Sequence, residues 1–430
     1  MIKATELPIW LKAPDFHADA CAWVTDFRQQ QWQAFLKCGI PSRQHERWKY
    51  GDLTFLANKN LSLAKKIDTT HLRHSIHQHR LQKGESILLV MVNGYFIPEL
   101  SDLHKLPATV IACRLSEAFK THEELIKPHW PFAVDASHYA LANLNAAMGE
   151  DGLFFYLPQQ VELTEPIHLL SLVLDDAEFI AHPRHVLVLG QHSKLMLMEE
   201  HFANVDQLYC MNHVTTIFAD KHAQLQHYKI QSEGKKAVHI AQTFIHQAEE
   251  STVELNYFSS GAHFARDDVL VKLQGTGAKC GASGFYHLRN DQQFIDHHVD
   301  MVHTAARSQS AMLYKGILEQ KSRAVFNGRL LIEKNAQKVV GHQANHNLLL
   351  SREAEVYSKP ELEIYADDVQ CKHGATTGQM DEEALFYLRS RGIQQADAVN
   401  ILLQGFAEEI MQRITHAGIK MRVQEIMSCS

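Results

Sequence analysis

The central part of this sequence is a long run of short β-strand patterns. Between Asp151 and His373, apolar stretches such as 185–189, 194–198 and 225–230 are separated by turn residues. Several of these stretches begin after a small residue, and these starts recur roughly every 28 to 30 residues. The small residues are Ser193, Ala223, Ser251 and Ser308. This spacing equals one coil of a parallel β-helix, or one double hairpin of a β-sandwich.

Three features favour the β-helix over the sandwich. The strand patterns are short, they continue for more than ~200 residues without a helical pattern, and helical patterns at both ends could cover sheet edges that would otherwise aggregate. The sequence therefore predicts a mainly β fold, with a parallel β-helix core flanked by N-terminal and C-terminal helical domains. We place the N-terminal helical region at 1–85, the β-helix core at 86–376 and the C-terminal helical domain at 377–430.

Composition and charge narrow the function. The 430 residues are 45% hydrophobic and 21% charged, which is typical of a folded globular chain. The formal net charge of −7 argues against a nucleic-acid binder, which needs clustered Lys and Arg. No apolar run is long enough to span a membrane, and no secretory signal pattern occurs. The seven cysteines stand singly, which favours reduced thiols over disulfides. We expect a cytoplasmic protein that binds neither nucleic acid nor membrane.

The transition from the β region to the C-terminal helices carries the main candidate site. Two strand patterns meet at a corner at 367–368, and Gly374 and Gly378 are expected to end the second strand. Within that strand Cys371 and His373 are two residues apart. Because side chains alternate between the faces of a strand, both fall on the same face.

Cys371 and His373 together could contact iron. On one face of a strand their side chains lie about 7 Å apart, a distance that one metal ion or the edge of a cluster could bridge. Thiolate and imidazole both suit iron, but two protein ligands cannot complete a cluster site, so further ligands would have to come from another subunit. The alternative is structural, with a buried thiol beside Val369 and a hydrogen-bonded histidine.

Two amphipathic helices are predicted after this strand. Asp381 is a suitable N-cap for the first helix, and the second begins near Asp397. The second helix carries an apolar stripe that we expect to pack against the end of the β-helix and the first helix. The stripe consists of Val399, Leu402, Leu403, Phe406, Ile410 and Ile414. On the first helix Glu383, Tyr387 and Arg391 would then remain available to a partner.

Motifs for independent catalysis are missing from the sequence. It contains no phosphate-binding G-x-x-x-x-G-K-[ST] loop, no G-x-S-x-G elbow and no H-E-x-x-H pair. Some parallel β-helices cleave sugars with paired carboxylates, and Asp296 and Asp300, next to His297 and His298, are the candidate group for that chemistry. They would fit a surface loop equally well. A stand-alone β-helix enzyme acting on carbohydrate is therefore the alternative function.

Three segments resemble a known family. The run CKHGATTGQMDEEALFYLRSRGI, from Cys371 to Ile393, resembles the SufB/SufD family of iron–sulfur cluster assembly proteins, and its SufD type in particular. The SufB type has Glu at the position of Gly374. The segment GIPSRQHERWKY at 39–50 is similar to the N-terminal signature of the family, and 144–167 is similar to the segment that enters its core.

The resemblance implies a fold and a function. The fold is a right-handed parallel β-helix between helical end domains. The function is that of a non-catalytic subunit of a SufB–SufC–SufD scaffold on which iron–sulfur clusters form and iron is acquired, so the chain is not expected to be an enzyme. It also implies that the isolated chain binds no cofactor stably, and that iron or a cluster is held transiently in the complex.

The resemblance also implies two partners. A SufB-like paralogue pairs with this chain through the ends of the two β-helices, so that His373 faces a cysteine of SufB. A SufC-like ATPase binds the C-terminal helices, for which Glu383, Tyr387 and Arg391 are the candidate contacts. A homodimer of the isolated chain is an open alternative.

Overall fold

The computed structural model describes residues 1–430 except 1–7, 9–10, 17–20, 70–71, 73–75, 77, 82–85, 131–137, 150, 175–176, 204 and 428–430. The predicted boundary between residues 85 and 86 therefore lies at the end of the segment 82–85, which is outside the described residues. Cys429 is also outside them. None of the described cysteines forms a disulfide. No described helix is long and apolar enough to cross a membrane.

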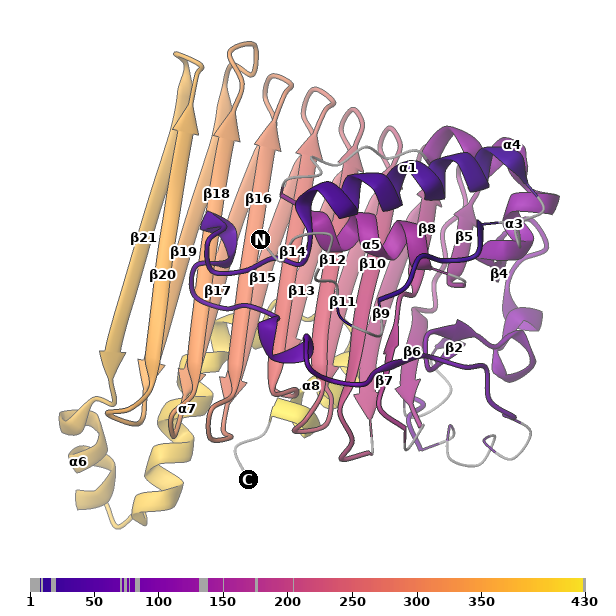
Figure 1. The fold of residues 1–430 in the computed structure, drawn as a ribbon. Coiled ribbons are helices and arrows are strands. Elements are labelled where there is room, and N and C mark those ends of the chain that lie inside the picture. Colours follow the sequence, from indigo (N-terminus) through magenta and orange to yellow (C-terminus); the bar gives the residue numbers. More distant parts are fainter. Residues whose placement is uncertain are drawn as a thin grey trace.

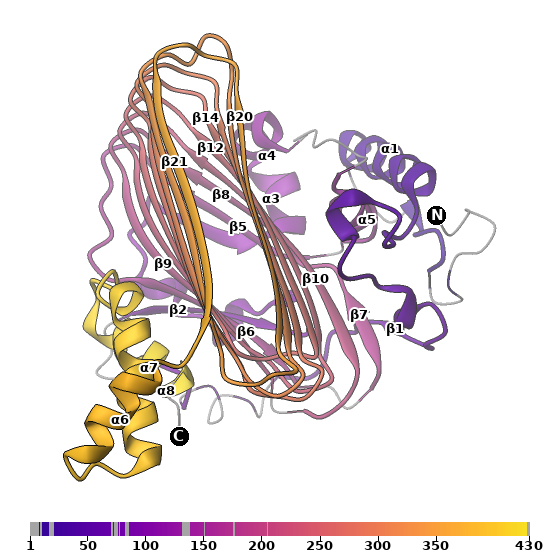
Figure 2. The ribbon, with the colours of Figure 1, turned by 90° about the vertical axis from the view of Figure 1, so that its left-hand side faces the viewer.

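The chain coils through two facing sheets and forms a parallel β-helix, so the predicted core is confirmed (Figures 1 and 2). From β8 onward each coil gives one strand to each sheet, and every strand pairs in parallel with the strand two further along the chain. The first sheet contains β1 (Ser62–Leu63), β4 (Ile111–Arg114), β5 (Leu153–Leu157), β7 (Phe179–Ala181), β8 (Arg184–Leu189), β10 (Tyr209–Ala219), β12 (Val238–Gln247), β14 (Phe264–Leu273), β16 (Phe294–His303), β18 (Arg323–Ile332) and β20 (Glu355–Ile364).

The second sheet is built in the same way. It contains β2 (Ile87–Val92), β3 (Tyr95–Phe96), β6 (Ile167–Val173), β9 (Lys194–Ala203), β11 (Gln224–Ser232), β13 (Thr252–Ser259), β15 (Lys279–Leu288), β17 (Gln309–Leu318), β19 (Val339–Leu349) and β21 (Val369–Gln379). Two antiparallel pairs, β2 with β3 and β4 with β5, occur at the first end of the coil stack.

A tight corner explains the repeat of small residues in the sequence. Residues with left-handed backbone conformation recur at this corner, among them His192 (φ 57°), His222 (φ 57°) and Glu250 (φ 52°). The next residues are Ser193, Ala223 and Ser251, each at most 1% exposed. Successive coils stack at this corner, as the bond from the His222 N–H to the Glu249 carbonyl (2.9 Å) illustrates. A large side chain directly after the corner would therefore separate the coils.

The N-terminal part covers the outer face of the first sheet. Helices α1 (Ala22–Cys38) and α5 (Ala140–Met148) pack on each other and on this sheet, and the short α3 (Leu115–Thr121) and α4 (Glu123–Ile126) lie beside the first coils (Figure 1). The 39–50 segment anchors this part of the chain. Arg47 donates to Asp300 (2.8 Å) and Asp268 (3.3 Å), and Arg266 lies 4.0 Å from the ring centroid of Trp48.

The C-terminal helices α7 (Gln395–Met411) and α8 (Ala417–Met427) lie against the other sheet, whereas α6 (Glu382–Ser390) contacts α7 and projects beyond the sheet (Figure 2). The stripe of α7 packs on the outer face of the second sheet, where Leu403 and Ile410 join Tyr228, Phe285 and Leu313. We expected the stripe to pack on the end of the β-helix and on the first helix. The contact between α6 and α7 is present, but the position at the end of the β-helix is wrong, because the outer face of the second sheet is itself apolar and needs cover.

The last strand also differs from the expectation. The corner at 367–368 and the N-cap at Asp381 are confirmed, and the Asp381 carboxylate accepts from the N–H groups of Glu383 (2.9 Å) and Ala384 (3.0 Å). Gly374 and Gly378, however, do not end the strand, since β21 runs to Gln379. Glycine is tolerated there because the parallel ladder to β19 continues past both residues.

The anchoring of the 39–50 segment can be tested with Arg47→Met. The substitution leaves the buried Asp300 with one partner fewer, and loss of one member of a buried ion pair costs about 3 kcal/mol of unfolding free energy. We expect that loss in urea denaturation. The control is Arg43→Met, which breaks the exposed pair with Asp52 and should cost less than about 1 kcal/mol. Equal stability of the two variants would contradict the anchoring role.

The same pair predicts a difference in pH dependence. Burial opposes ionisation of Asp300, but Arg47 and Arg329 lower its pKa below the ordinary value. Its stabilising contribution is therefore complete above the unfolded-state pKa of about 3.9 and is lost progressively as the pH falls from there through the lower folded-state pKa. We expect the difference in unfolding free energy between wild type and Arg47→Met to become smaller between about pH 6 and about pH 3. A gap that stays constant over this range would rule out the ionised pair as its source.

Candidate functional site

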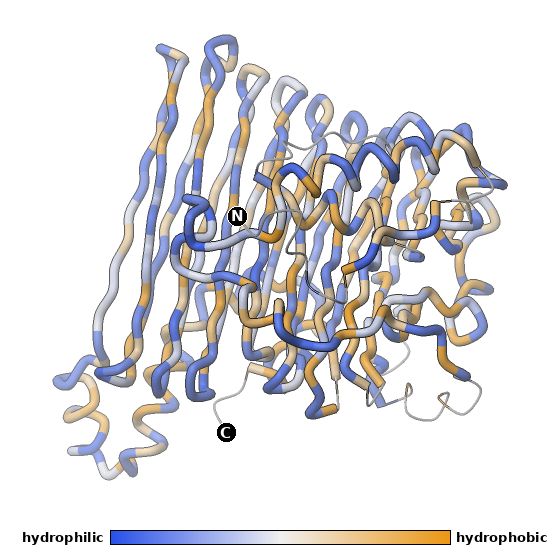
Figure 3. Tube along the Cα trace, viewed as in Figure 1, coloured by the Kyte–Doolittle hydropathy of each residue, from blue (hydrophilic) through white to orange (hydrophobic). Residues whose placement is uncertain are grey.

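The last coil of the β-helix forms an open end. Strand β20 pairs with β18 alone and β21 with β19 alone, and no element of the described chain lies across the end in Figure 2. Nearly all of β21 is exposed, whereas the middle strands are buried on both faces. Figure 3 shows the last coil mainly in blue and white, while orange recurs along the inner coils. The row of side chains that points inward elsewhere is accessible here.

Cys371 lies in this inward row and packs against the coil below. It contacts a small apolar cluster formed by Ile332, Ala336, Val339 and Ala366, with Val369 beside it. Its sulfur lies 3.4 Å from the position that a Cβ on Gly341 would occupy. Burial raises the pKa of the half-buried thiol. Cys371 thus has surroundings typical of a packing residue, with the thiol held in its protonated form.

His373 is the next residue in the same row, and it is exposed. It pairs in register with Gln343 of β19, and a Cβ added at the neighbouring Gly374 would meet nothing within 4 Å. The inward row of β19 is polar, with Gln343, Asn345 and Asn347 all buried. The imidazole therefore stands over this polar row, while the neighbouring Gly374 faces the opposite side of the strand. A neutral imidazole in this position can bind a metal ion or accept a proton from a partner.

The surface of α6 forms a second candidate site. Glu383, Tyr387 and Arg391 are all exposed, and Arg391 donates to the Tyr387 hydroxyl (3.2 Å). Sequence reasoning missed Phe386, which is 73% exposed beside Tyr387 at 57%. Two adjacent aromatic residues at the surface are typical of a protein contact. The signal was present in the sequence as an aromatic pair on a short capped helix.

The carboxylates considered for carbohydrate chemistry do not form a catalytic pair. Asp296 and Asp300 lie in β16, on the face that points out of the β-helix, and they are buried under the N-terminal part. The expectation that they fit a surface loop is wrong. Asp296 is paired with Arg266 and His298, and Asp300 with Arg47 and Arg329. Although burial opposes ionisation, these cations lower both pKa values, so neither group is suited to donate a proton.

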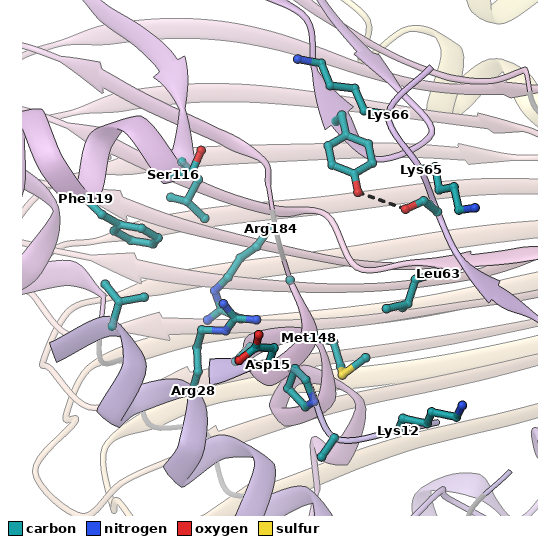
Figure 4. A pocket seen from close by; sticks show the side chains of 18 of the residues that line it. Lys12, Asp15, Arg28, Leu63, Lys65, Lys66, Ser116, Phe119, Met148 and Arg184 are labelled. Atoms are coloured by element: carbon teal, nitrogen blue, oxygen red, sulfur yellow. Dashed lines mark hydrogen bonds between the residues drawn. The ribbon is translucent and has the colours of Figure 1, made fainter. Parts of the chain in front are cut away.

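A cavity of ≈ 1010 Å³ lies beside the first coils, between α1, α3 and the segment around β1 (Figure 4). Its lining is cationic and includes Lys12, Lys65, Lys66, Arg28 and Arg184. Burial lowers the pKa of Arg184 to about 10, and its guanidinium lies 5.0 Å from the ring centroid of Trp130. Arg28 donates to the Ala147 carbonyl (3.0 Å). The two arginines thus join α1 and α5 to the first sheet, far along the coil stack from His373.

Comparison with known proteins agrees with this architecture. The family model of the SUF system FeS cluster assembly SufBD core domain matches residues 172–406, and the model of the SufBD protein N-terminal region matches 13–169. The chain is 30% identical to an iron–sulfur cluster assembly SufBD family protein of Synechocystis, over 91% of this chain and 87% of the relative. It is also 30% identical to the iron–sulfur cluster assembly protein SufD of Escherichia coli, over 92% and 90%. The chain therefore belongs to the SufBD family of iron–sulfur cluster assembly proteins.

Proposed function

We propose that this chain is the SufD-type, non-catalytic subunit of a scaffold formed with a SufB-like paralogue and a SufC-like ATPase. The observation that carries the proposal is the open end of the β-helix, where the inward row presents Cys371 and His373. A cluster or iron ion bound there would need ligands from the facing subunit. The iron is cargo of this site and is held transiently.

The backbone of the last coil supports pairing with a second β-helix. The outer edges of β20 and β21 have no partner strand among the described residues, so both offer unpaired N–H and C=O groups. A paralogue with the same coil geometry can continue both sheets across the junction. A second copy of this chain could do the same when the paralogue is missing. In either case His373 would come to lie inside the joined β-helices, away from water.

The α6 helix supports docking of the ATPase. Its exposed face carries Phe386 and Tyr387, while α7 and α8 are occupied with the second sheet. The ATPase would then contact the scaffold beside the open end, since α6 follows β21 directly. A movement of the bound ATPase could then be transmitted from α6 to His373 through the short segment between α6 and β21. The carbohydrate alternative is not supported, because its carboxylates are buried in ion pairs.

The role of His373 can be tested with His373→Ala in the three-subunit complex. We expect the subunits to assemble normally and the iron and acid-labile sulfide content to fall roughly tenfold after anaerobic purification, because a ligand is lost. Cys371→Ala should cost less, since the thiol is half-buried in the coil below. The matched control is His342→Ala, which removes an exposed histidine from the outer face of β19. Normal cluster content in His373→Ala would exclude the role.

Docking of the ATPase can be tested with Phe386→Asp. A charge in the centre of an aromatic contact should weaken binding by at least ~2 kcal/mol, or roughly 30-fold. Affinity can be measured by calorimetry with the purified ATPase. Met421→Asp, on the exposed side of α8, is the control and should change affinity less than about threefold. Unchanged affinity in Phe386→Asp would place the docking surface elsewhere.

Point substitutions are preferable to a truncation after β21. Removing α7 and α8 would expose the apolar outer face of the second sheet, including Tyr228, Phe285 and Leu313. Loss of binding could then reflect aggregation rather than loss of a contact surface.

A further inference from the structure

The interior of the β-helix contains a polar region among apolar coils. Its histidines were not singled out by the sequence, although 29 histidines in 430 residues is a large number. Histidines 201, 213, 227 and 239 occupy inward positions of β9, β10, β11 and β12, and each is at most 2% exposed. They lie several coils from the open end, so they are separate from Cys371 and His373 (Figure 1).

Three of these histidines converge on one point. Ring nitrogens of His201, His213 and His239 lie within 4.8 Å of one another. The ring centroids are 4.5 Å apart for His201 and His213, 4.8 Å for His201 and His239, and 5.3 Å for His213 and His239. His201 comes from the second sheet and the other two come from the first. The group therefore spans the interior between the sheets.

Buried carboxylates lie beside two of the rings. Nε2 of His201 lies 2.9 Å from Oε1 of Glu199, and Nδ1 of His239 lies 2.7 Å from Oε2 of Glu233. The Glu199 carboxylate accepts a hydrogen bond from Nε2 of His201, so Nδ1 of that ring keeps its lone pair. The Glu233 carboxylate is close enough to favour the proton on Nδ1 of His239, although the two groups are not aligned as a hydrogen bond. Such carboxylate–histidine pairs are the usual support of histidine metal ligands.

The remaining nitrogens have no hydrogen-bond partner. Nδ1 of His201 and both nitrogens of His213 and of His239 are buried and have no hydrogen-bond partner among the described residues. An unpaired buried acceptor costs about 1–3 kcal/mol, and three at one point is unusual in a folded core. By contrast, His303, elsewhere in the interior, has both nitrogens 2.8 Å from serine hydroxyls, of Ser308 and Ser310.

The charges around the group also suit a cation. Burial lowers the pKa of His201 and of His213, which keeps both rings neutral, the form that binds metals. Burial opposes ionisation of Glu233, but His239 lowers its pKa to about 2, so it is ionised. Glu199 is ionised for the same reason, beside His201 and His227. Lys229, the nearby cation, is already paired with Asp267.

The geometry points to a buried site for one divalent transition-metal ion, bound by Nδ1 of His201, Nε2 of His239 and one ring nitrogen of His213. Imidazole ligands select ions such as Zn²⁺ and Fe²⁺ over Mg²⁺ or Ca²⁺. With metal–nitrogen distances of about 2.1 Å, the rings would have to close by roughly 1 Å. His185 and Glu199 form an overlapping group with His213, so a fourth donor is within reach. The ion would join the two sheets across the interior.

The site can be tested by metal analysis of the full-length chain without a histidine tag. The chain is expressed in medium with Zn²⁺, or with Co²⁺ in its place, and washed with a chelator to remove surface ions. We expect about one ion per chain by mass spectrometry, and visible bands of four-coordinate Co²⁺ in the cobalt form. Zinc X-ray absorption should report imidazole nitrogens as the ligands.

Matched variants assign the ion to these residues. His213→Gln and His239→Gln should reduce the metal content to less than about a tenth of an ion per chain, because a three-ligand site loses most of its affinity with one ligand. His303→Gln removes an equally buried histidine and should keep the ion. A metal-free wild-type chain, binding no Co²⁺, would overturn the proposal and leave a buried water as the partner of the three rings. Equal metal content in His213→Gln would overturn it as well, and if the variants fail to fold, the cobalt and X-ray spectra of the wild type decide the matter.

Discussion

Hydrogen bonding at the ends of the coil stack is the constraint on which the rest of this structure depends. Inside a parallel β-helix each coil satisfies the backbone of its neighbours, so only the two ends leave strands with unpaired edges. The first end is closed by the antiparallel strands β3 and β4 and by the N-terminal segments. The last end has no such cover among the described residues, and β20 and β21 present their edges there. The last coil of the described chain therefore offers backbone N–H and C=O groups to a further strand.

The outer faces of the two sheets explain the helical ends. The outer face of the second sheet is apolar, and that of the first carries apolar residues beside buried ion pairs, so each needs a covering layer. Helices α1 and α5 cover the first sheet. The N-terminal part is also held there by the ion pair of Arg47 with Asp300 and by the contact of the Trp48 ring with Arg266. Helices α7 and α8 cover the second sheet. The family signature at 39–50 thus holds the N-terminal part on the first sheet in this protein, while Phe386 and Tyr387 of α6 stay exposed.

The interior combines apolar rows with polar regions, one of which holds the histidine group. Glu199, His201 and His227 would be expensive to bury singly, but the carboxylate satisfies one nitrogen of each ring. The unpaired nitrogens of His201, His213 and His239 converge between the two sheets, where one bound ion would remove the free-energy cost of three buried acceptors without partners. The polar region lies coils away from His373, so the two sites can be altered independently.

The sequence by itself determined the coil repeat and the shared face of Cys371 and His373. A small residue after the corner, such as Ser193 or Ser251, recurs at the spacing of the coils because close stacking leaves no room for a large side chain there. Strand alternation placed Cys371 and His373 on one face. Local pattern could not decide that Gly374 lies within a strand, because the pairing with β19 supplies that stability from a distant segment. Local pattern also could not predict that His201, His213 and His239 meet, because only the stacking of the coils brings them together. It could not predict the ion pair of Asp300 with Arg47 either, because that contact depends on the docking of the N-terminal part.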